Sequence, residues 1–295
     1  MSSAGFVGLA GRPNVGKSTL VNALVGSKIA ITSDRPQTTR RAARGVLTDG
    51  DRQVVLIDLP GVQKPQDALT RRMQSRVETE LAEADIVLMV LDAHQGVGPG
   101  DRFIANVLLE ASGDKPVLAA VNKVDRLGKQ ATAAALQAVA ELEAIDELFP
   151  VCATNGSGVA ELARRMWELA PEGPHHYPPG EHSDQDPHVL FGELVREQTI
   201  RRTRQELPHA VEVVVTDVER REDGLTSITA RIWVESDSQK AIVVGRGGRM
   251  IRDIGSAARR SLQRETGGKV FLDLTVKVRK DWRRDETMLD RFGIE

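Results

Sequence analysis

The segment Gly11–Ser18, which reads GRPNVGKS, constrains the fold of this chain more than any other. It matches the pattern G-x-x-x-x-G-K-[ST], follows the apolar run Val7–Ala10 and opens a helical pattern over Lys17–Val25. A glycine-rich turn between a strand and a helix directs backbone N–H groups and the helix N-terminus at one point, which suits phosphate oxygens. The sequence therefore predicts a parallel α/β sheet with a phosphate-binding loop at the carboxyl end of a strand.

Two side chains of this loop have defined chemical roles. Lys17 would bridge β- and γ-phosphate oxygens, and the Ser18 hydroxyl would ligate Mg²⁺, which prefers oxygen ligands. The whole loop is predicted to contact the nucleotide through Gly11, Arg12, Pro13, Asn14, Val15, Gly16, Lys17 and Ser18.

The tetrapeptide Asn122–Asp125, which reads NKVD, bears on the identity of the base, because a phosphate loop alone also fits kinases and ATPases. It follows the apolar run Val117–Val121. The Asp125 carboxylate accepts hydrogen bonds from guanine N1–H and N2–H, donors that adenine does not offer in this geometry. Asn122 would bond the base or the neighbouring loops, and the stem of Lys123 would lie over the ring. The predicted guanine pocket comprises Asn122, Lys123, Val124, Asp125, Cys152 and Ala153, with the Ala153 N–H facing guanine O6.

Two further segments are predicted to sense the γ-phosphate. Asp58–Leu59–Pro60–Gly61 follows the run Val54–Ile57; Asp58 would hold Mg²⁺ through water, and the Gly61 N–H would reach the γ-phosphate. Val62 follows and is also predicted to contact the nucleotide. It occupies a position where many GTPases carry a glutamine that orients the attacking water. Valine cannot hydrogen-bond water, so we expect slow hydrolysis.

The polar loop Ser33–Arg40 offers two hydroxyls for the other Mg²⁺ contact, and we favour Thr39 over Thr38. The catalytic set is then Lys17, Thr39 and Gly61, and the metal ligands are Ser18, Thr39 and, through water, Asp58. Because no arginine finger is evident, a K⁺ ion held by Asn14 and nearby carbonyls is a further hypothesis.

The order of apolar and helical patterns divides the chain into two predicted domains. Residues 1–170 alternate strands with helices over Thr70–Ala82, Ala131–Leu142 and Gly158–Ala170, as in a mostly parallel sheet covered on both faces. Residues 171–187 are rich in proline and charge and are predicted to form a flexible linker. Residues 188–295 are expected to form a smaller α+β domain.

Within that second domain, a helix over Val189–Glu206 precedes a hairpin of Ala210–Glu219 and Leu225–Glu235. Two short helices meeting at a glycine turn, a strand over Lys269–Val278 and a helical piece from Trp282 complete the prediction.

The glycine turn reads Gly245-Arg246-Gly247-Gly248 and is a GXXG loop, as in KH modules that bind about four unstacked nucleotides. Between Arg246 and Arg284 there are 12 Lys and Arg against 4 Asp and Glu, which favours an anionic partner. Trp282 is either a base-stacking residue or part of the core. The predicted RNA-binding residues are Gly245, Arg246, Gly247, Gly248, Arg249, Arg252, Lys277, Arg279, Lys280, Trp282 and Arg283.

Composition and apolar runs limit the location of the chain. The longest apolar run, Ala84–Ala93, is too short to cross a bilayer. The single cysteine, Cys152, excludes an internal disulfide and fits a reducing cytosol.

Together these motifs resemble the bacterial Era family of ribosome-associated GTPases with a C-terminal type II KH domain. The resemblance covers nearly the whole chain, including PQTTR at Pro36–Arg40, PEGPHHYP at Pro171–Pro178, ELVREQ at Glu193–Gln198, ELPHAV at Glu206–Val211 and VKVRKDWR at Val276–Arg283. It implies a GTP-dependent switch in assembly or maturation of the 30S ribosomal subunit. It also implies single-stranded RNA near the 3′ end of small-subunit ribosomal RNA as the KH ligand. A cytoplasmic monomer is expected, with a fraction at the inner face of the cell membrane.

Two other classes of protein would each require a sequence feature of their own. An RNA-modifying enzyme needs a second catalytic site, and residues 188–295 show no nucleophile–base pair or metal cluster in sequence. A membrane-signalling GTPase needs a lipidation signal, and the ending FGIE contains no prenylation cysteine.

Overall fold

The computed structural model of the chain describes residues 2–33, 38–203, 207 and 210–294, which form two compact units. The first unit comprises Met1–Ala30, Thr39–Gln66 and Thr70–Asp184, and the second comprises Ile31–Thr38, Asp67–Leu69 and Gln185–Glu295. Some predicted features lie outside the described residues: positions 34–37 of the polar loop, 204–206 at the end of the first helix of the second domain, and 208–209 of the ELPHAV motif.

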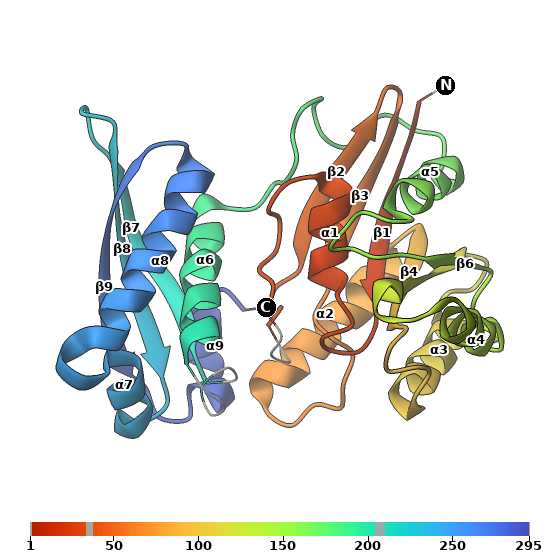
Figure 1. Ribbon diagram of the computed structural model, residues 1–295. Coiled ribbons are helices and arrows are strands. Elements are labelled where there is room, and N and C mark those ends of the chain that lie inside the picture. The colour runs from red at the N-terminus through yellow and green to blue at the C-terminus, as the bar shows by residue number, and fades with distance from the viewer. Residues whose placement is uncertain (1, 34–37, 204–206, 208–209, 295) are drawn as a thin grey trace. The chain divides into compact units, whose positions relative to one another are not determined.

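The first unit contains a six-stranded sheet with the order β2-β3-β1-β4-β5-β6 (Figure 1). Five strands are parallel, whereas β2 pairs antiparallel with β3 at the edge. The ranges predicted as strands included neither β2 nor β6. The strands are β1 (Ser3–Ala10), β2 (Ala43–Asp49), β3 (Arg52–Asp58), β4 (Ile86–Asp92), β5 (Val117–Asn122) and β6 (Glu147–Pro150). The predicted mostly parallel α/β sheet is confirmed.

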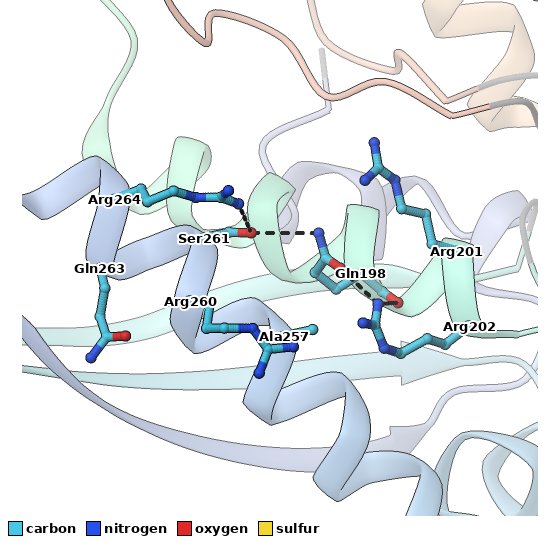
Figure 2. Close-up of a pocket in the computed structure, with 8 residues that line it drawn as sticks. All are labelled: Gln198, Arg201, Arg202, Ala257, Arg260, Ser261, Gln263 and Arg264. Carbon is cyan, nitrogen blue, oxygen red and sulfur yellow. Dashed lines mark hydrogen bonds between the residues drawn. The ribbon is translucent and has the colours of Figure 1, made fainter.

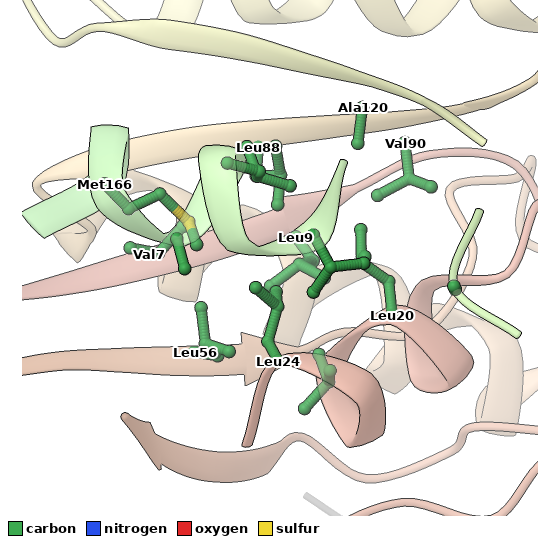
Figure 3. Packing of buried hydrophobic residues seen from close by; sticks show 14 of the residues in the cluster. Val7, Leu9, Leu20, Leu24, Leu56, Leu88, Val90, Ala120 and Met166 are labelled. Atoms are coloured by element: carbon green, nitrogen blue, oxygen red, sulfur yellow. The ribbon is translucent and has the colours of Figure 1, made fainter. Parts of the chain in front are cut away.

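Helices cover both faces of this sheet, which explains why β4 is apolar along its length. Ile86, Leu88 and Val90 pack with α1 and α5 in one cluster, part of which Figure 3 shows. The alternate residues Val87 and Met89 face the opposite cluster with α3 and α4. The helices are α1 (Lys17–Val25), α2 (Ala68–Glu83), α3 (Pro99–Ala111), α4 (Lys129–Ala140) and α5 (Val159–Leu169).

The stretch predicted as a flexible linker, 171–187, is mostly part of the first unit. Its carbonyls accept bonds from the sheet: Ala4 N–H donates to Pro171 O at 3.0 Å and Val46 N–H to His182 O at 2.9 Å. The Gln53 side chain accepts from the N–H groups of His176 and Tyr177. The proline-rich sequence indicated a lack of regular structure. The backbone of this stretch still accepts hydrogen bonds from N–H groups of β1 and β2. The first unit therefore extends to Asp184.

The second unit has a three-stranded sheet, β7-β8-β9, in which β7 and β8 are antiparallel and β8 and β9 are parallel. Residues along β8 alternate between buried and half-buried, so one face of the sheet meets the helices. The strands are β7 (Glu212–Arg220), β8 (Leu225–Val234) and β9 (Lys269–Val278).

The element order helix-strand-strand-helix-helix-strand is that of the predicted type II KH domain. The helices are α6 (Pro187–Arg202), α7 (Asp237–Val244), α8 (Arg249–Thr266) and α9 (Glu286–Arg291). At 18 residues α8 is longer than the short helix expected, and its buried residues Ile254, Ala258 and Leu262 share one helical face. In the described parts of the chain, no helix is long and apolar enough to cross a membrane.

Trp282 is a core residue of the second unit. Its side chain is fully buried, its Nε1–H donates to Ala210 O at 3.0 Å, and its ring meets Phe292 edge-on. The alternative that Trp282 stacks on an RNA base is therefore wrong, because an enclosed indole has no accessible face.

We expect Trp282→Ala to reduce the free energy of unfolding by about 3–5 kcal/mol, because it leaves a cavity and removes the partner of Ala210 O. Trp282→Phe should cost less. Urea unfolding followed by circular dichroism would measure both variants, with Phe271→Ala as a control at an exposed aromatic side chain. An alanine variant as stable as the parent would contradict the packing role.

Candidate nucleotide site and nucleic-acid interface

The phosphate loop joins β1 to α1 and has a tightly packed backbone. Gly11 and Gly16 have φ values of 146° and 103°, in a region that side chains rarely adopt. A Cβ atom at Gly16 would lie 2.3 Å from Asn122 Nδ2, and one at Gly11 would lie 2.5 Å from Val90 O. Glycine is therefore required at both positions for the loop to approach the ends of β4 and β5.

The Lys17 side chain folds back into the phosphate loop. Its Nζ donates to Gly11 O at 2.9 Å and to Arg12 O at 3.1 Å. Burial lowers the Lys17 pKa to about 8, and the nearby Asp58 carboxylate only partly offsets that effect. A phosphate anion would stabilise the charged ammonium, so this position suits the predicted phosphate contact.

Three oxygen-bearing side chains converge beside Lys17. The Ser18 hydroxyl donates to Asp58 Oδ2 at 2.7 Å and lies 3.0 Å from Thr39 Oγ1, which is 3.3 Å from the same carboxylate oxygen. The three predicted Mg²⁺ ligands thus lie together, although they come from α1, the end of β3 and the loop before β2. The hydroxyl at this point belongs to Thr39, as the preference over Thr38 predicted.

Asp58 fits a cation site on electrostatic grounds. Its Oδ1 atom is buried and has no hydrogen-bond partner among the described residues. Burial raises the Asp58 pKa to about 6, although the Ser18 bond, the Lys17 charge and the Thr39 bond oppose that shift. A divalent cation would compensate the buried charge, and two neighbouring hydroxyls offer the hard oxygen ligands that Mg²⁺ prefers.

The segment Asp58–Gly61 lies against the phosphate loop. A Cβ atom at Gly61 would come within 2.8 Å of Pro13, and the Val62 N–H donates to Gly11 O at 3.2 Å. Pro60 is buried. Leu59 is fully buried in a cluster with Ile57 and Val77, so its side chain packs in the core and cannot contact a nucleotide.

Gln74, on α2, was not predicted as a site residue. Its side chain bonds to the backbone at and just after Gly61. Its Nε2 donates to Gly61 O at 3.1 Å and its Oε1 accepts from Gln63 N–H at 3.1 Å. Glutamine in a helical pattern gives no sequence signal for such a role.

Asn122 connects three parts of the site. Its Nδ2 donates to Val15 O at 3.0 Å, and its Oδ1 accepts from the N–H groups of Lys123 and Ala153 at 2.9 and 3.1 Å. Of the two roles considered for Asn122, bonding to neighbouring loops is the one that the structure contains. The Ala153 N–H, predicted to face guanine O6, donates to Asn122 here.

Lys123 and Asp125 follow at the carboxyl end of β5. The Lys123 Nζ donates to Asn14 O at 2.8 Å and to Asp92 Oδ2 at 2.7 Å, which places its stem beside the phosphate loop. Burial opposes ionisation of Asp92, but Lys123 and two backbone N–H groups outweigh it and lower its pKa. Asp125 is exposed and Val124 half-buried, so the Asp125 carboxylate is accessible to a base.

The Cys152 side chain lies away from that pocket. It is buried, with its Sγ 3.2 Å from Thr154 Oγ1, and its N–H donates to Ser157 O. Cys152 therefore contributes to the segment's packing rather than to contact with the base through its side chain.

Arg12, within the phosphate loop, is bound to α3 rather than left free for phosphate. Its Nε donates at 2.8 Å to Asp101, which is fully buried and also accepts from Gly98 N–H. A Cβ atom at Gly100 would lie 2.7 Å from the Arg12 stem. Asp101 was not predicted as a partner of Arg12, because it lies far from the loop along the chain.

The GXXG loop joins α7 to α8 in the second unit. Gly245, Gly247 and Gly248 have φ values of 71°, 58° and 72°, which explains the need for glycine. Arg252 donates to Gly247 O at 2.8 Å and Gly248 O at 3.2 Å, so it holds the loop as well as adding charge. Arg246 and Arg249 lie on the same junction between the helices.

The remaining basic candidates lie at the end of β9 and beyond it. Lys277 and Lys280 are exposed, whereas Arg279 forms an ion pair with Asp285 at 2.5 Å. Arg283 pairs with Asp67, which belongs to the same unit. Arg283 is therefore engaged within the protein, and its prediction as an RNA contact is not supported by its geometry.

Two exposed apolar side chains were missed as candidates. Ile242 is 40% exposed and lies one turn before Gly245 on α7, and Phe271 on β9 is 54% exposed. Burial alternates along β9, so Phe271 lies with Asp273 and Thr275 on the exposed face of the strand.

We predict that Asp58→Asn stabilises the ligand-free protein at pH 7.5 by on the order of 2 kcal/mol. The folded-state pKa is raised from 3.8 to about 6, so the carboxyl is protonated at low pH and costs stability as pH rises from about 4 through 6. The gain should vanish at pH 4. Thermal unfolding across this range would measure it, with Asp51→Asn as an exposed control. A variant less stable than the parent at pH 7.5 would contradict the burial argument.

Two family models match the chain. The model described as a 50S ribosome-binding GTPase covers residues 6–123, and the KH domain model covers residues 206–283.

Curated relatives match almost from end to end. GTPase Era of Mycolicibacterium smegmatis is 43% identical over 98% of both chains, and GTPase Era of Carboxydothermus hydrogenoformans is 42% identical over 98% of this chain and 97% of its own.

Solved structures agree with these matches. An Era crystal structure with MgGDPNP and nucleotides 1506–1542 of 16S ribosomal RNA has a TM-score of 0.95 and 31% identity, over 100% of this chain and 99% of that one. A variant of Aquifex aeolicus Era bound to GDP·AlF4− also gives a TM-score of 0.95 at 31% identity, over 99% of both chains. With its nucleotide site, its KH unit and this likeness along its full length, the chain belongs to the Era family of GTPases.

Proposed function

We propose that this chain is a GTP-dependent switch that binds small-subunit ribosomal RNA near its 3′ end and acts in assembly or maturation of the 30S subunit. The single observation that carries the nucleotide half is the convergence of Ser18, Thr39 and Asp58 beside the buried Lys17. The RNA half rests on the GXXG loop and on the complex of a related Era with a 16S ribosomal RNA fragment.

In this proposal the chain's residues divide the work of binding GTP. Lys17 and the backbone of Gly11–Ser18 hold the phosphates, and the exposed Asp125 carboxylate reads the guanine edge. Ser18, Thr39 and, through water, Asp58 hold Mg²⁺, which when bound neutralises phosphate charge. Gly61, held by Pro13 and Gln74, presents its N–H toward the γ-phosphate.

Slow hydrolysis resets the switch. Val62 has an apolar side chain where other GTPases orient water with glutamine, and Leu59 is sequestered in the core. K⁺ held near Asn14 would supply positive charge in the transition state; Asn14 has a φ of 65°, which turns the loop backbone at that position. Equal hydrolysis rates in K⁺ and Na⁺ would exclude that role.

In this proposal, RNA binding and nucleotide binding are coupled. Occupancy by GTP orders the segments around Thr39 and Gly61, and that order favours the RNA-competent state. The coupling is reciprocal for binding, so RNA increases GTP affinity by the same factor. The proposed setting is a cytoplasmic monomer, a fraction of which associates with the inner membrane surface.

Replacing Asp125 with asparagine should shift the base preference from guanine toward xanthine, because the amide donates where the carboxylate only accepts. Competition of GTP and XTP for a fluorescent nucleotide would measure the shift. Asp114→Asn, which changes another exposed carboxylate of the same unit, is the control. Unaltered preference for GTP would exclude Asp125 as the base-reading residue.

Replacing Gly247 with aspartate should reduce RNA affinity at least about tenfold while leaving GTP affinity intact, because it adds a charge where phosphates would pass. No described atom lies within 4 Å of a Cβ built at Gly247, so the added side chain has room. Gly247→Asn is the matched control, since asparagine also tolerates the positive φ but is neutral.

Crosslinking to isolated 30S subunits, with a non-hydrolysable GTP analogue or GDP, would provide the functional readout. We expect crosslinks near the 3′ end of the ribosomal RNA that depend on the analogue and are lost in Gly247→Asp. Recovery of no ribosomal RNA in either nucleotide state would refute the proposal.

A further inference from the structure

A basic pocket lies between α6 and α8 of the second unit, on the C-terminal half of α8. Its volume is about 460 Å³, within the range of small-ligand sites. Figure 2 shows side chains of both helices around it. The residues that line it are Gln198, Arg201, Arg202, Ala257, Arg260, Ser261, Gln263 and Arg264.

In the described part of the chain, the walls of this pocket carry four arginines and no carboxylate. Among the residues that the structure describes, Arg201 alone of the four has an acidic partner, Glu197, at 3.1 Å. Arg202 and Arg264 donate to neutral side chains, and Arg260 has no hydrogen-bond or ion-pair partner among the described residues. Arg202, Arg260 and Arg264 therefore contribute positive charge that no carboxylate among the described residues neutralises.

Two buried polar residues join the helices at this pocket. The Gln198 Nε2 lies 3.5 Å from Ser261 Oγ, and Gln198 Oε1 accepts from Arg202 at 2.7 Å. Arg264 reaches the same Ser261 hydroxyl at 3.3 Å. The bonds at Ser261 are long, so an anion could replace them with shorter, charge-assisted bonds at little cost.

The chemistry of the lining selects among anionic ligands. Guanidinium groups from two facing helices match the forked geometry of phosphate oxygens. Of the described lining residues Ala257 is the one apolar residue and none is aromatic, so these residues offer no surface for stacking a base. The pocket is also separate from the GXXG loop, because Ala257, the lining residue of α8 nearest that loop, follows Gly248 by nine residues, a helical rise of about 14 Å.

We propose that this pocket is a binding site for a small oligophosphate, separate from both the GTP site and the GXXG loop. The four arginines hold the phosphate groups, and Gln198 and Ser261 provide neutral hydrogen bonds at the helix junction. The pocket recognises the phosphate chain without reading a base.

The test uses the full chain with its GTP site saturated by excess non-hydrolysable GTP analogue and Mg²⁺, so that added inorganic triphosphate reports on other sites. Isothermal titration calorimetry should detect one site. Arg260→Ala combined with Arg264→Ala should weaken it at least about tenfold. The corresponding double lysine variant, which keeps the charge but loses the fork, should give an intermediate affinity.

Arg259→Ala is the matched control, because Arg259 is an exposed arginine of α8 outside the lining of the pocket. It should change triphosphate affinity less than about twofold. The alanine substitutions are at exposed side chains, and unchanged unfolding temperatures would confirm that the variants fold.

Two outcomes would overturn the proposal: no triphosphate binding to the nucleotide-loaded chain, or equal losses in Arg259→Ala and the double alanine variant. If the first outcome is accompanied by loss of affinity for an RNA oligonucleotide in the double alanine variant, the pocket belongs to the RNA backbone instead. None of these affects the proposed function, which depends on the Gly247 variants.

Discussion

The bonds of the Asn122 amide are the interaction on which the nucleotide site depends. One side chain donates to Val15 in the phosphate loop and accepts from Lys123 and Ala153 in the two segments predicted to surround the base. Gly16 leaves the space in which that amide lies. Because a buried amide left unpaired is costly, these three loops are held in one arrangement before any ligand is present. The distance between phosphate recognition and base recognition is thus set by the protein.

The centre of the site stores unfavourable electrostatics. Asp58 and Lys17 are both buried, and desolvation moves both pKa values toward the neutral forms. Each charge is stabilised when an ion of opposite sign binds. The same burial that favours ligand binding therefore lowers the stability of the ligand-free protein. The proposed Mg²⁺ and phosphate contacts therefore use groups that destabilise the fold when no ligand is bound.

The second unit places two basic regions on one helix. The GXXG loop precedes α8, and its glycines have positive φ, which would let an RNA backbone approach closely. The proposed oligophosphate pocket lies along the C-terminal half of α8. The buried face of α8 packs on α6 and β9, so the helix is a fixed support for both. Trp282 contributes to the same unit as a core side chain, with its N–H satisfied by Ala210.

The sequence by itself determined the fold class and the positions of the glycine turns at Gly11–Ser18 and Gly245–Gly248, because each depends on neighbouring residues and on strand or helix periodicity. The guanine-reading role of Asn122–Asp125 stays a prediction from the sequence. The sequence also indicated Thr39, whose hydroxyl lies beside Ser18. Tertiary structure decided the features whose partners lie far along the chain. It buried Trp282 against Phe292, engaged Arg283 with Asp67, bound residues 171–184 to the first sheet and brought Asp101 to Arg12. It also formed the basic pocket, since the arginines of α6 and α8 become neighbours only when the two helices pack. Local sequence fixes which groups a segment offers, whereas burial and pairing depend on what the folded chain places opposite them.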